Sequence, residues 1–323
     1  MTPRKKSGSG QGKLILFGEH SAVHGYPALG IPLPCQTQVR WECSQDGSTQ
    51  IEIPNPQDKE RFTKLLLNCV QQGWLSGPEG KWTIESTVNR AGGFGSSAAL
   101  CVALVRLLQD SKNHYTPMIH ERANILEQQF HGTPSGIDTG MSSDQGLAAW
   151  TFCEAQIPHR TPLSLPSWYL AYGAIPRQSS TAKTVGQLRQ RIHEAEISTI
   201  MHDLGVLTEE MILDTNPMGF SQRAAQRVKH AQALLTRLNL STEILEEVLN
   251  RAVSCGFDAG KLSGGGSGGA FYLCASSQEQ RDDALERLKN TLKNKSYIQG
   301  ELLPLDLHPD REMSSSSLPY AAE

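Results

Sequence analysis

Several features are absent from this 323-residue sequence, and each absence excludes a class of protein. No stretch approaches about 18 uninterrupted apolar residues, and no apolar segment follows the basic residues near the start, so neither a membrane span nor an export signal is predicted. The seven cysteines form no C-x-x-C pair, which argues against a zinc module or a disulfide framework. The formal net charge of −3 provides no general attraction to nucleic acid or anionic lipid. These absences predict a cytoplasmic protein with reduced thiols that binds neither nucleic acid nor membranes.

The familiar nucleotide-binding signatures are also missing. No G-x-x-x-x-G-K-[ST] segment occurs, and the catalytic-loop strings of protein kinases are absent, so Walker-type NTPases and protein kinases are excluded. Gly93, Gly95 and Ala98 do match G-x-G-x-x-G/A between a predicted strand and a predicted helix. A dinucleotide site would also need an acidic residue at the end of the next strand, whereas the next acidic residue, Asp110, falls at the end of the helix. Hydride-transfer chemistry is therefore disfavoured.

A chain of this length and ordinary composition is long enough for two domains with a cleft between them. The Gly- and Ser-rich residues 1–11 are interpreted as a flexible arm, and residues 309–323 as a loose tail. A boundary just before Trp168 divides the rest into residues 12–166 and 167–308. Apolar periodicity predicts strands at 14–17, 38–42, 50–53, 82–88 and 168–172, helices at 59–72, 97–108, 119–130, 182–213, 220–238 and 244–252, and a hairpin at 260–274.

The most informative segment is glycine-rich and leads into a helix. Residues 92–95 precede Ser96 and Ser97, which are expected at the helix cap, and apolar residues then recur every three or four positions, as one buried helical face requires. The free N–H groups and the positive dipole end of such a helix face one point and form an anion site. A tight turn without a ligand is the alternative interpretation of this segment taken alone.

Three further segments favour the phosphate-binding interpretation. Residues 12–20 read Gly-Lys-Leu-Ile-Leu-Phe-Gly-Glu-His, residues 131–138 read His-Gly-Thr-Pro-Ser-Gly-Ile-Asp, and residues 261–270 read Lys-Leu-Ser-Gly-Gly-Gly-Ser-Gly-Gly-Ala. By composition the last segment could be a flexible spacer. Because it is expected to join two short apolar strands, its backbone can instead approach a phosphate or the first glycine loop closely.

Together these four segments resemble the motifs of the galactokinase, homoserine kinase, mevalonate kinase and phosphomevalonate kinase (GHMP kinase) family. The resemblance covers the chain from about Lys13 to Cys274. It implies an α+β, two-lobed GHMP-kinase fold with the active site in the cleft. The N-terminal, ATP-binding domain would be similar to domain 2 of ribosomal protein S5, and the C-terminal domain would be ferredoxin-like. ATP as phosphoryl donor and Mg²⁺ as cofactor are implied with it.

The resemblance also implies the catalytic residues. Asp138 would be the carboxylate facing the substrate hydroxyl, with Lys13 beside it, because a carboxylate can accept the hydroxyl proton while a lysine stabilises charge on the transferred group. A structural ion pair is the alternative for these two residues. Ser97 and Glu127 resemble the family's magnesium ligands, and Mg²⁺ prefers such oxygen donors. A solvated charge at a helix end is the alternative for Glu127.

Substrate contacts follow from the same resemblance. Glu19 and His20 fall where the family contacts its acceptor, and His20 is expected to hydrogen-bond a polar group of that molecule. Thr181 resembles the family's substrate-side threonine. Compared with the family pattern, this chain has two extra residues between Arg177 and Thr181, so Ser179 or Ser180 is the alternative for that role. The nucleotide-binding residues implied are Gly92, Gly93, Phe94, Gly95, Ser96, Ser97 and Ala98.

Within the family, Lys13 and Asp138 favour direct phosphorylation of mevalonate by ATP, which gives 5-phosphomevalonate for isoprenoid biosynthesis. Other acceptors are alternatives: phosphomevalonate would require more basic residues, and the galactokinase-like and homoserine-kinase-like members lack this Lys–Asp pair. A non-catalytic nucleotide or metabolite sensor is a further alternative, but it should have lost part of the set that also contains Ser97 and Glu127. Because family members are often dimers, a homodimer is expected as well.

Overall fold

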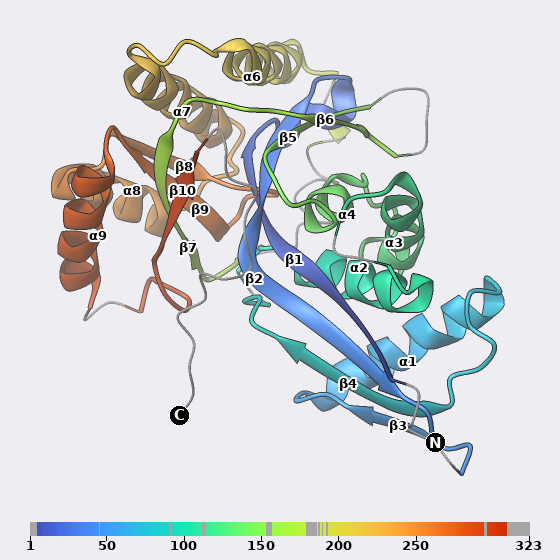
Figure 1. Cartoon of the computed structure of the whole chain (residues 1–323). Helices are drawn as coiled ribbons and strands as arrows, with labels where there is room; N and C mark the ends of the chain where they lie inside the picture. The colour runs from blue at the N-terminus through green and yellow to red at the C-terminus, as the bar shows by residue number, and fades with distance from the viewer. Residues whose placement is uncertain are drawn as a thin grey trace.

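The computed structural model describes residues 5–44, 46–90, 92–111, 114–152, 157–178, 186, 188, 190–191, 193–293 and 296–308. Within these residues the strands form two sheets, one in each lobe (Figure 1). The first sheet has the order β3-β4-β2-β5-β6, with β1 paired to β2, and the second has the order β10-β7-β9-β8. The first contains β1 (Lys5–Phe17), β2 (Ala28–Glu42), β3 (Thr49–Glu52), β4 (Gly80–Ser86), β5 (Ala148–Thr151) and β6 (His159–Pro162); the second contains β7 (Trp168–Ile175), β8 (Ala259–Leu262), β9 (Gly269–Ala275) and β10 (Leu303–Leu307).

Helices accompany each sheet, and most begin at a residue that suits a helix start. The side chains of Asn55, Thr116, Thr242 and Ser277 each accept a hydrogen bond from a backbone N–H in the first turn of the helix that follows. The first lobe contains η1 (Ala22–His24), α1 (Pro56–Gln71), α2 (Ser96–Gln109), α3 (Pro117–His131) and α4 (Ile137–Ser142); the second contains α6 (Ala195–Leu213), α7 (Phe220–Arg237), α8 (Glu243–Cys255) and α9 (Gln278–Leu292).

The interpretation of residues 1–11 as a flexible arm is wrong for residues 5–11. These residues continue β1, which pairs antiparallel with β2 from Lys5 opposite Glu42 to Phe17 opposite Leu29. The glycines that suggested flexibility allow α2 to lie against the strand, since a Cβ atom at Gly8 or Gly10 would come within 2.2 Å of a backbone oxygen of α2. Close helix contact therefore explains the small residues.

The hydrophobic core is continuous between the lobes. Leu14, Leu16 and Phe17 of β1 belong to the same buried cluster as Trp168 and Tyr272 of the second sheet. A separate cluster fills the space between the first sheet and α1 to α3. Since apolar burial is worth roughly 25 cal/mol per Å², this shared core holds the two lobes together along β1. Strand β1, which lies in this shared core, also carries the candidate site residue Lys13.

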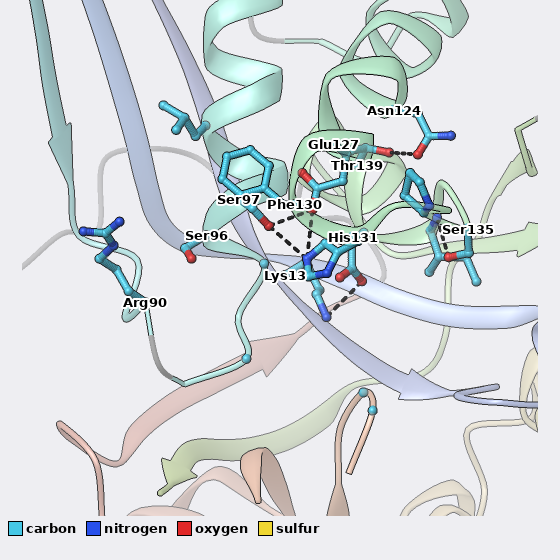
Figure 2. Close-up of a pocket in the computed structure, with 18 of the residues that line it drawn as sticks. Lys13, Arg90, Ser96, Ser97, Asn124, Glu127, Phe130, His131, Ser135 and Thr139 are labelled. Carbon is cyan, nitrogen blue, oxygen red and sulfur yellow. Dashed lines mark hydrogen bonds and ion pairs between the residues drawn. The ribbon is translucent and has the colours of Figure 1, made fainter. Parts of the chain in front are cut away.

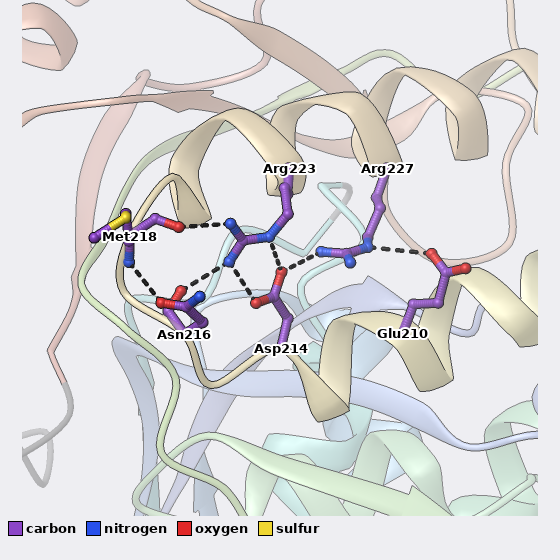
Figure 3. A network of polar contacts seen from close by, with 6 residues as sticks. All are labelled: Glu210, Asp214, Asn216, Met218, Arg223 and Arg227. Atoms are coloured by element: carbon purple, nitrogen blue, oxygen red, sulfur yellow. Dashed lines mark hydrogen bonds and ion pairs between the residues drawn. The ribbon is translucent and has the colours of Figure 1, made fainter.

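The α6–α7 turn is held by a network of charged side chains (Figure 3). Arg223 donates to both carboxylate oxygens of Asp214, at 2.8 and 2.6 Å, and Arg227 donates to the same carboxylate at 2.6 Å. The hydrogen bonds from Arg223, foremost, lower the pKa of Asp214 to about 2. The pairing keeps α6 and α7 antiparallel beside the second sheet.

Most elements expected from the sequence are present, with shifted ends. The predicted helix at 59–72 corresponds to α1, and the hairpin around the last glycine motif consists of β8 and β9, paired from Ala259 opposite Cys274 to Leu262 opposite Phe271. Within the predicted helix at 182–213, the described residues 186, 188 and 190 are helical, and α6 begins at Ala195. No element was predicted from the sequence at η1, α4, β5, β6, α9 or β10. The chain passes from the first sheet to the second between Pro162, where β6 ends, and Trp168, where β7 begins. The domain limits stay a prediction, and the predicted loose tail at 309–323 lies outside the described residues.

Candidate active site

The four predicted motifs meet at one cavity of about 1100 Å³. Its wall is formed by β1 and the turn that follows it, the start of α2, the end of α3, the start of α4 and the loop between β8 and β9. Figure 2 shows part of this wall, with the side chains of Lys13, Ser97, Glu127 and His131 directed toward one another. The predicted site residues that line the cavity are Lys13, Glu19, His20, Gly93, Gly95, Ser96, Ser97, Glu127 and Asp138.

The start of α2 presents open backbone donors to the cavity. The N-cap is Gly95, in the left-handed region at φ 74°, and Ser96 is the first helical residue, so the serines lie one position further into the helix than expected. The first intrahelical bond of this turn runs from the N–H of Ala99 to the oxygen of Gly95. Among the described residues, the N–H groups of Ser96, Ser97 and Ala98 have no acceptor. Open N–H groups and the helix dipole together suit an anion.

Lys13 and Asp138 form an ion pair at the cavity wall. Lys13 Nζ lies 3.0 Å from Asp138 Oδ1, and the lysine side chain is 4 % exposed while the aspartate side chain is 40 % exposed. The backbone N–H of Lys13 donates to the oxygen of Phe94 at 2.9 Å, which joins β1 to the glycine loop. A Cβ atom at Gly95 would lie 2.8 Å from Lys13 Cγ, so the glycine leaves room for the lysine stem. The pair is thus rigid on the lysine side and open to a ligand on the aspartate side.

Glu127 is a buried carboxyl in contact with Ser97. Ser97 Oγ donates to Glu127 Oε1 at 2.6 Å, Cys101 Sγ donates to Glu127 Oε2 at 3.4 Å, and His131 Nε2 lies 3.2 Å from Glu127 Oε1 (Figure 2). Burial raises the pKa of Glu127 to about 8, and the negative charge of Asp138 adds to the effect. Glu127 is 1 % exposed, which excludes the interpretation as a solvated helix-end charge. A cation beside these oxygen atoms would stabilise the ionised form of the Glu127 carboxyl.

Glu19 lines the cavity but is paired inside the protein. Its carboxylate contacts Lys261, whose ammonium group also donates to the oxygens of Leu16 at 3.2 Å and Leu262 at 2.8 Å. Both charged side chains are almost fully buried, so the pair connects the first motif to the third. This pairing disfavours Glu19 as a direct substrate contact, and that assignment stays a prediction.

His20 of the first motif lines the cavity in an unusual backbone conformation. It has φ 66°, a left-handed conformation that is uncommon for a residue other than glycine and that is found at functional sites. Burial, foremost, and the charge of Lys261 lower the pKa of His20 to about 4, so its ring is neutral near pH 7. Its Nε2 is buried without a hydrogen-bond partner among the described residues. A polar ligand group could satisfy this atom.

Three of the predicted nucleotide-binding residues do not line the cavity. These residues are Gly92, Phe94 and Ala98. The Phe94 ring is 5 % exposed and packs edge-on against Tyr172, with ring centroids 5.5 Å apart, in the core between the lobes, so the assignment of Phe94 to the nucleotide stays a prediction. Thr181 and the neighbouring serines 179 and 180 lie outside the described residues.

The third glycine motif packs against the strand end that leads to residue 178. Gln178 N–H donates to the oxygen of Ser267 at 2.8 Å, and Cβ atoms at Gly268 and Gly269 would come within 3 Å of Pro176 or Arg177. The motif therefore forms a close contact rather than a flexible spacer. Gly264 differs, since a Cβ atom there would meet only Lys13 Nζ, at 3.9 Å, so this part of the loop faces the cavity.

Sequence reasoning missed several polar residues of the cavity wall. Arg177 lies beside Gly93 and Gly269 and lines the cavity. His131 lies four residues after Glu127 on α3, and Asn124 lies three residues before it, so the i, i+3 and i, i+4 spacing was the available signal. Arg90, labelled in Figure 2, also lines the cavity and contacts the buried Asp58. The segment containing Arg90 carried no recognisable motif.

The comparisons with known proteins agree with the geometry. The model of the GHMP kinases N terminal domain matches residues 61–143, and the model of the GHMP kinases C terminal domain matches residues 221–294. The chain belongs to the GHMP kinase family and has its two-domain α+β fold, as the motifs implied. Members of this family use ATP as phosphoryl donor.

Individual relatives and solved structures that match most of the chain include several mevalonate kinases. The chain is 28 % identical over 315 residues to the mevalonate kinase of Pyrococcus abyssi, covering 86 % of this chain and 91 % of the relative. It is 26 % identical over 314 residues to the mevalonate kinase of Methanothermobacter thermautotrophicus, covering 92 % and 99 %. A crystal structure of the L. major mevalonate kinase in complex with R-mevalonate superposes with a TM-score of 0.79 at 23 % identity, covering 96 % and 98 % of the two chains. The fold is shared also with the Lactococcus lactis galactokinase, with a TM-score of 0.69 at 12 % identity over 95 % and 94 % of the chains.

Proposed function

We propose that this protein transfers the γ-phosphoryl group of ATP to the primary hydroxyl of mevalonate and releases 5-phosphomevalonate and ADP. The observation that carries this proposal is the Lys13–Asp138 pair at 3.0 Å, in the same cavity as the open N–H groups of α2. The curated relatives that cover most of the chain act as mevalonate kinases, which supports mevalonate as the acceptor.

Asp138 has the position and chemistry of a general base. Its carboxylate is open to the cavity on one side and paired with Lys13 on the other. As the acceptor oxygen attacks the γ-phosphorus, the hydroxyl proton passes to the Asp138 carboxylate, the bond between the γ-phosphorus and its bridging oxygen breaks, and ADP leaves. The buried Lys13 ammonium group stabilises the charge on the transferred group without needing to reorganise.

The phosphates of ATP would be bound by backbone donors. The N–H groups of Ser96, Ser97 and Ala98 point out of the first turn of α2, where the helix dipole favours negative charge. Arg177 adds a positive charge at the cavity wall, and Gly264 allows the third motif to approach without a side chain. This arrangement achieves phosphate binding without a Walker motif.

The residues around Glu127 fit a magnesium ion. Ser97 Oγ and the Glu127 carboxylate are adjacent oxygen donors, and burial alone disfavours the ionised carboxylate that a cation would stabilise. Among the described residues no group of three or more His, Cys, Asp or Glu side chains could hold a metal by itself, which suits an ion completed by ATP phosphates and water. When bound there, Mg²⁺ would neutralise charge on the β- and γ-phosphates.

The acceptor would lie on the other side of Asp138, toward His20. The unpartnered Nε2 of the neutral His20 ring is available to hydrogen-bond a polar group of the acceptor. Thr181 as a further acceptor contact, a cytoplasmic location and a homodimer stay predictions. Among the described residues, no helix combines the length and apolar character that crossing a membrane requires.

The direct test is ADP release with ATP and Mg²⁺ in separate reactions containing mevalonate, phosphomevalonate, galactose or homoserine. Saturable turnover with mevalonate alone is expected. Turnover with a different acceptor would refute the substrate assignment but leave the kinase chemistry, and absence of turnover with all four would favour a nucleotide sensor.

The variant Asp138→Ala tests the mechanism in the same assay. It is expected to lower kcat by about 10²- to 10⁴-fold, the usual contribution of a general base, while the affinity for ATP measured by calorimetry changes little. Retention of near-normal turnover would contradict the role of Asp138. A matched loss of ATP affinity would assign the residue to nucleotide binding instead.

A further inference from the structure

A buried histidine outside the predicted motifs contacts the loop that carries Asp138. His120 closes the first turn of α3, since its N–H donates to the oxygen of the N-cap Thr116 at 3.1 Å, and it is 0 % exposed. Its Nε2 lies 2.6 Å from the oxygen of Gly136, which is two residues before Asp138 in the chain. Its ring packs edge-on against Trp150, with centroids 5.4 Å apart, and close to Tyr115. None of the roles assigned above requires this residue.

The tautomer of His120 follows from its partners. A carbonyl oxygen only accepts hydrogen bonds, so Nε2 must carry the proton that it donates to Gly136. The Tyr115 hydroxyl lies 3.4 Å from Nδ1 and can donate to it. Burial lowers the pKa of His120 to about 4, so the ring is neutral near pH 7 and both nitrogens have complementary partners.

The carbonyl of Gly136 is held by several donors at once. It accepts from His120 Nε2 at 2.6 Å, from the N–H of Gly140 at 2.9 Å and from Thr139 Oγ1 at 3.2 Å. Gly136 is the N-cap of α4 and has φ 82°, and a Cβ atom there would lie 2.7 Å from Pro158. The bond from His120 is the shortest of the three and the only one that comes from outside the α4 turn. It therefore sets where α4 begins relative to α3.

We propose that His120 is a positioning residue for catalysis, and that its Nε2–H bond to the Gly136 oxygen orients the Asp138 carboxylate toward Lys13 and the acceptor hydroxyl. The proposal rests on the function assigned above, since it requires Asp138 to be the general base. Glu127 lies two turns further along α3, so one rigid helix supports both the carboxyl of the magnesium site and, through Gly136, the catalytic aspartate. A small displacement of α4 would move Asp138, which lies in its first turn.

Two substitutions separate hydrogen bonding from packing. His120→Gln retains an N–H donor at a similar reach, whereas His120→Met has a similar volume and no donor. We expect His120→Met to lower kcat roughly tenfold to hundredfold, because misplacement of a catalytic group by about 1 Å has effects of that size. The KM values for ATP and for the acceptor should change less than about twofold, and His120→Gln should recover most of the loss in kcat.

The control Tyr115→Phe removes the hydroxyl near Nδ1 but keeps the ring and the Gly136 bond, so its kcat should stay close to that of the parent. Equal kcat losses in His120→Gln and His120→Met would overturn the proposal in favour of packing. A rise in KM for ATP without a fall in kcat would overturn it as well.

An independent measurement covers the case in which His120→Met does not fold. Nitrogen NMR of the histidine-labelled parent protein reports which ring nitrogen of His120 is protonated. A protonated Nε2 in slow exchange with solvent supports the proposal, and a protonated Nδ1 with bare Nε2 overturns it. A parent protein without turnover on any acceptor refutes the proposed function, whereas an active parent with the wrong variant pattern refutes only the role of His120.

Discussion

Replacing Glu127 with glutamine should make the metal-free protein more stable while it impairs catalysis. The carboxyl is 1 % exposed, and burial raises its pKa from the ordinary value of 4.5 to about 8. Between these two pH values the folded protein holds a proton that the unfolded chain has released, so the free energy of unfolding falls as pH rises through this range. Glutamine cannot ionise, so the variant escapes this loss.

The magnitude follows from the pKa difference. Each pKa unit is worth about 1.4 kcal/mol, so the interval from 4.5 to about 8 corresponds to an upper limit of about 5 kcal/mol. The advantage of Glu127→Gln over the parent should be near its minimum below pH 4.5, grow between pH 4.5 and about 8, and then level off. The Ser97 hydroxyl can still donate to the amide oxygen, so that contact is retained.

The assay is urea unfolding of both proteins in the presence of a chelator, at about pH 5 and about pH 8.5, with ADP release measured in parallel. Glu121→Gln is the matched control, because Glu121 lies on the same helix but is exposed. The reasoning is refuted if the stability difference between Glu127→Gln and the parent is the same at both pH values within about 0.5 kcal/mol. Undiminished turnover of the Glu127→Gln variant would show that catalysis does not require Glu127 as a magnesium ligand.

Two other predictions concern how the motifs contact one another. Gly95→Ala places a Cβ atom 2.8 Å from Lys13 Cγ, at a residue with φ 74°, and should lower both kcat and stability. Gly47→Ala is the control: Gly47 has φ 70° but no atom within 4 Å of the added Cβ, so this variant should show only the backbone strain of about 1 kcal/mol. Similar kcat values for the two variants would contradict a steric effect on Lys13. Lys261→Met leaves the Glu19 carboxylate buried without its partner and should cost about 3–5 kcal/mol in a denaturation experiment, and adding Glu19→Leu should recover most of that loss. A double variant as unstable as the single one would show that the ion pair is not the source of the effect.

Local sequence signals predicted most of the elements that carry the site. The glycine loop before α2, the Leu14–Phe17 part of β1 and the β8–β9 hairpin could be predicted because apolar periodicity and glycine act over a few neighbouring residues. The family motifs also identified Lys13, Ser97, Glu127 and Asp138, all of which line one cavity. The same local reasoning failed for Gly8 and Gly10, because a glycine in a flexible arm and a glycine beneath a helix have the same composition.

The chemical groups of the candidate site can be named from the sequence: a carboxylate and an amine for proton transfer and charge stabilisation, oxygen donors for a metal, and a helix start with free N–H groups. Which of these groups are available to a ligand depends on contacts that exist only in the folded protein. Glu19 and Lys261 are far apart in the chain yet neutralise one another in the core, while Asp138 keeps one side open. Burial and pairing depend on contacts between distant segments, and these contacts raise the pKa of Glu127, lower that of His20 and join His120 to Gly136.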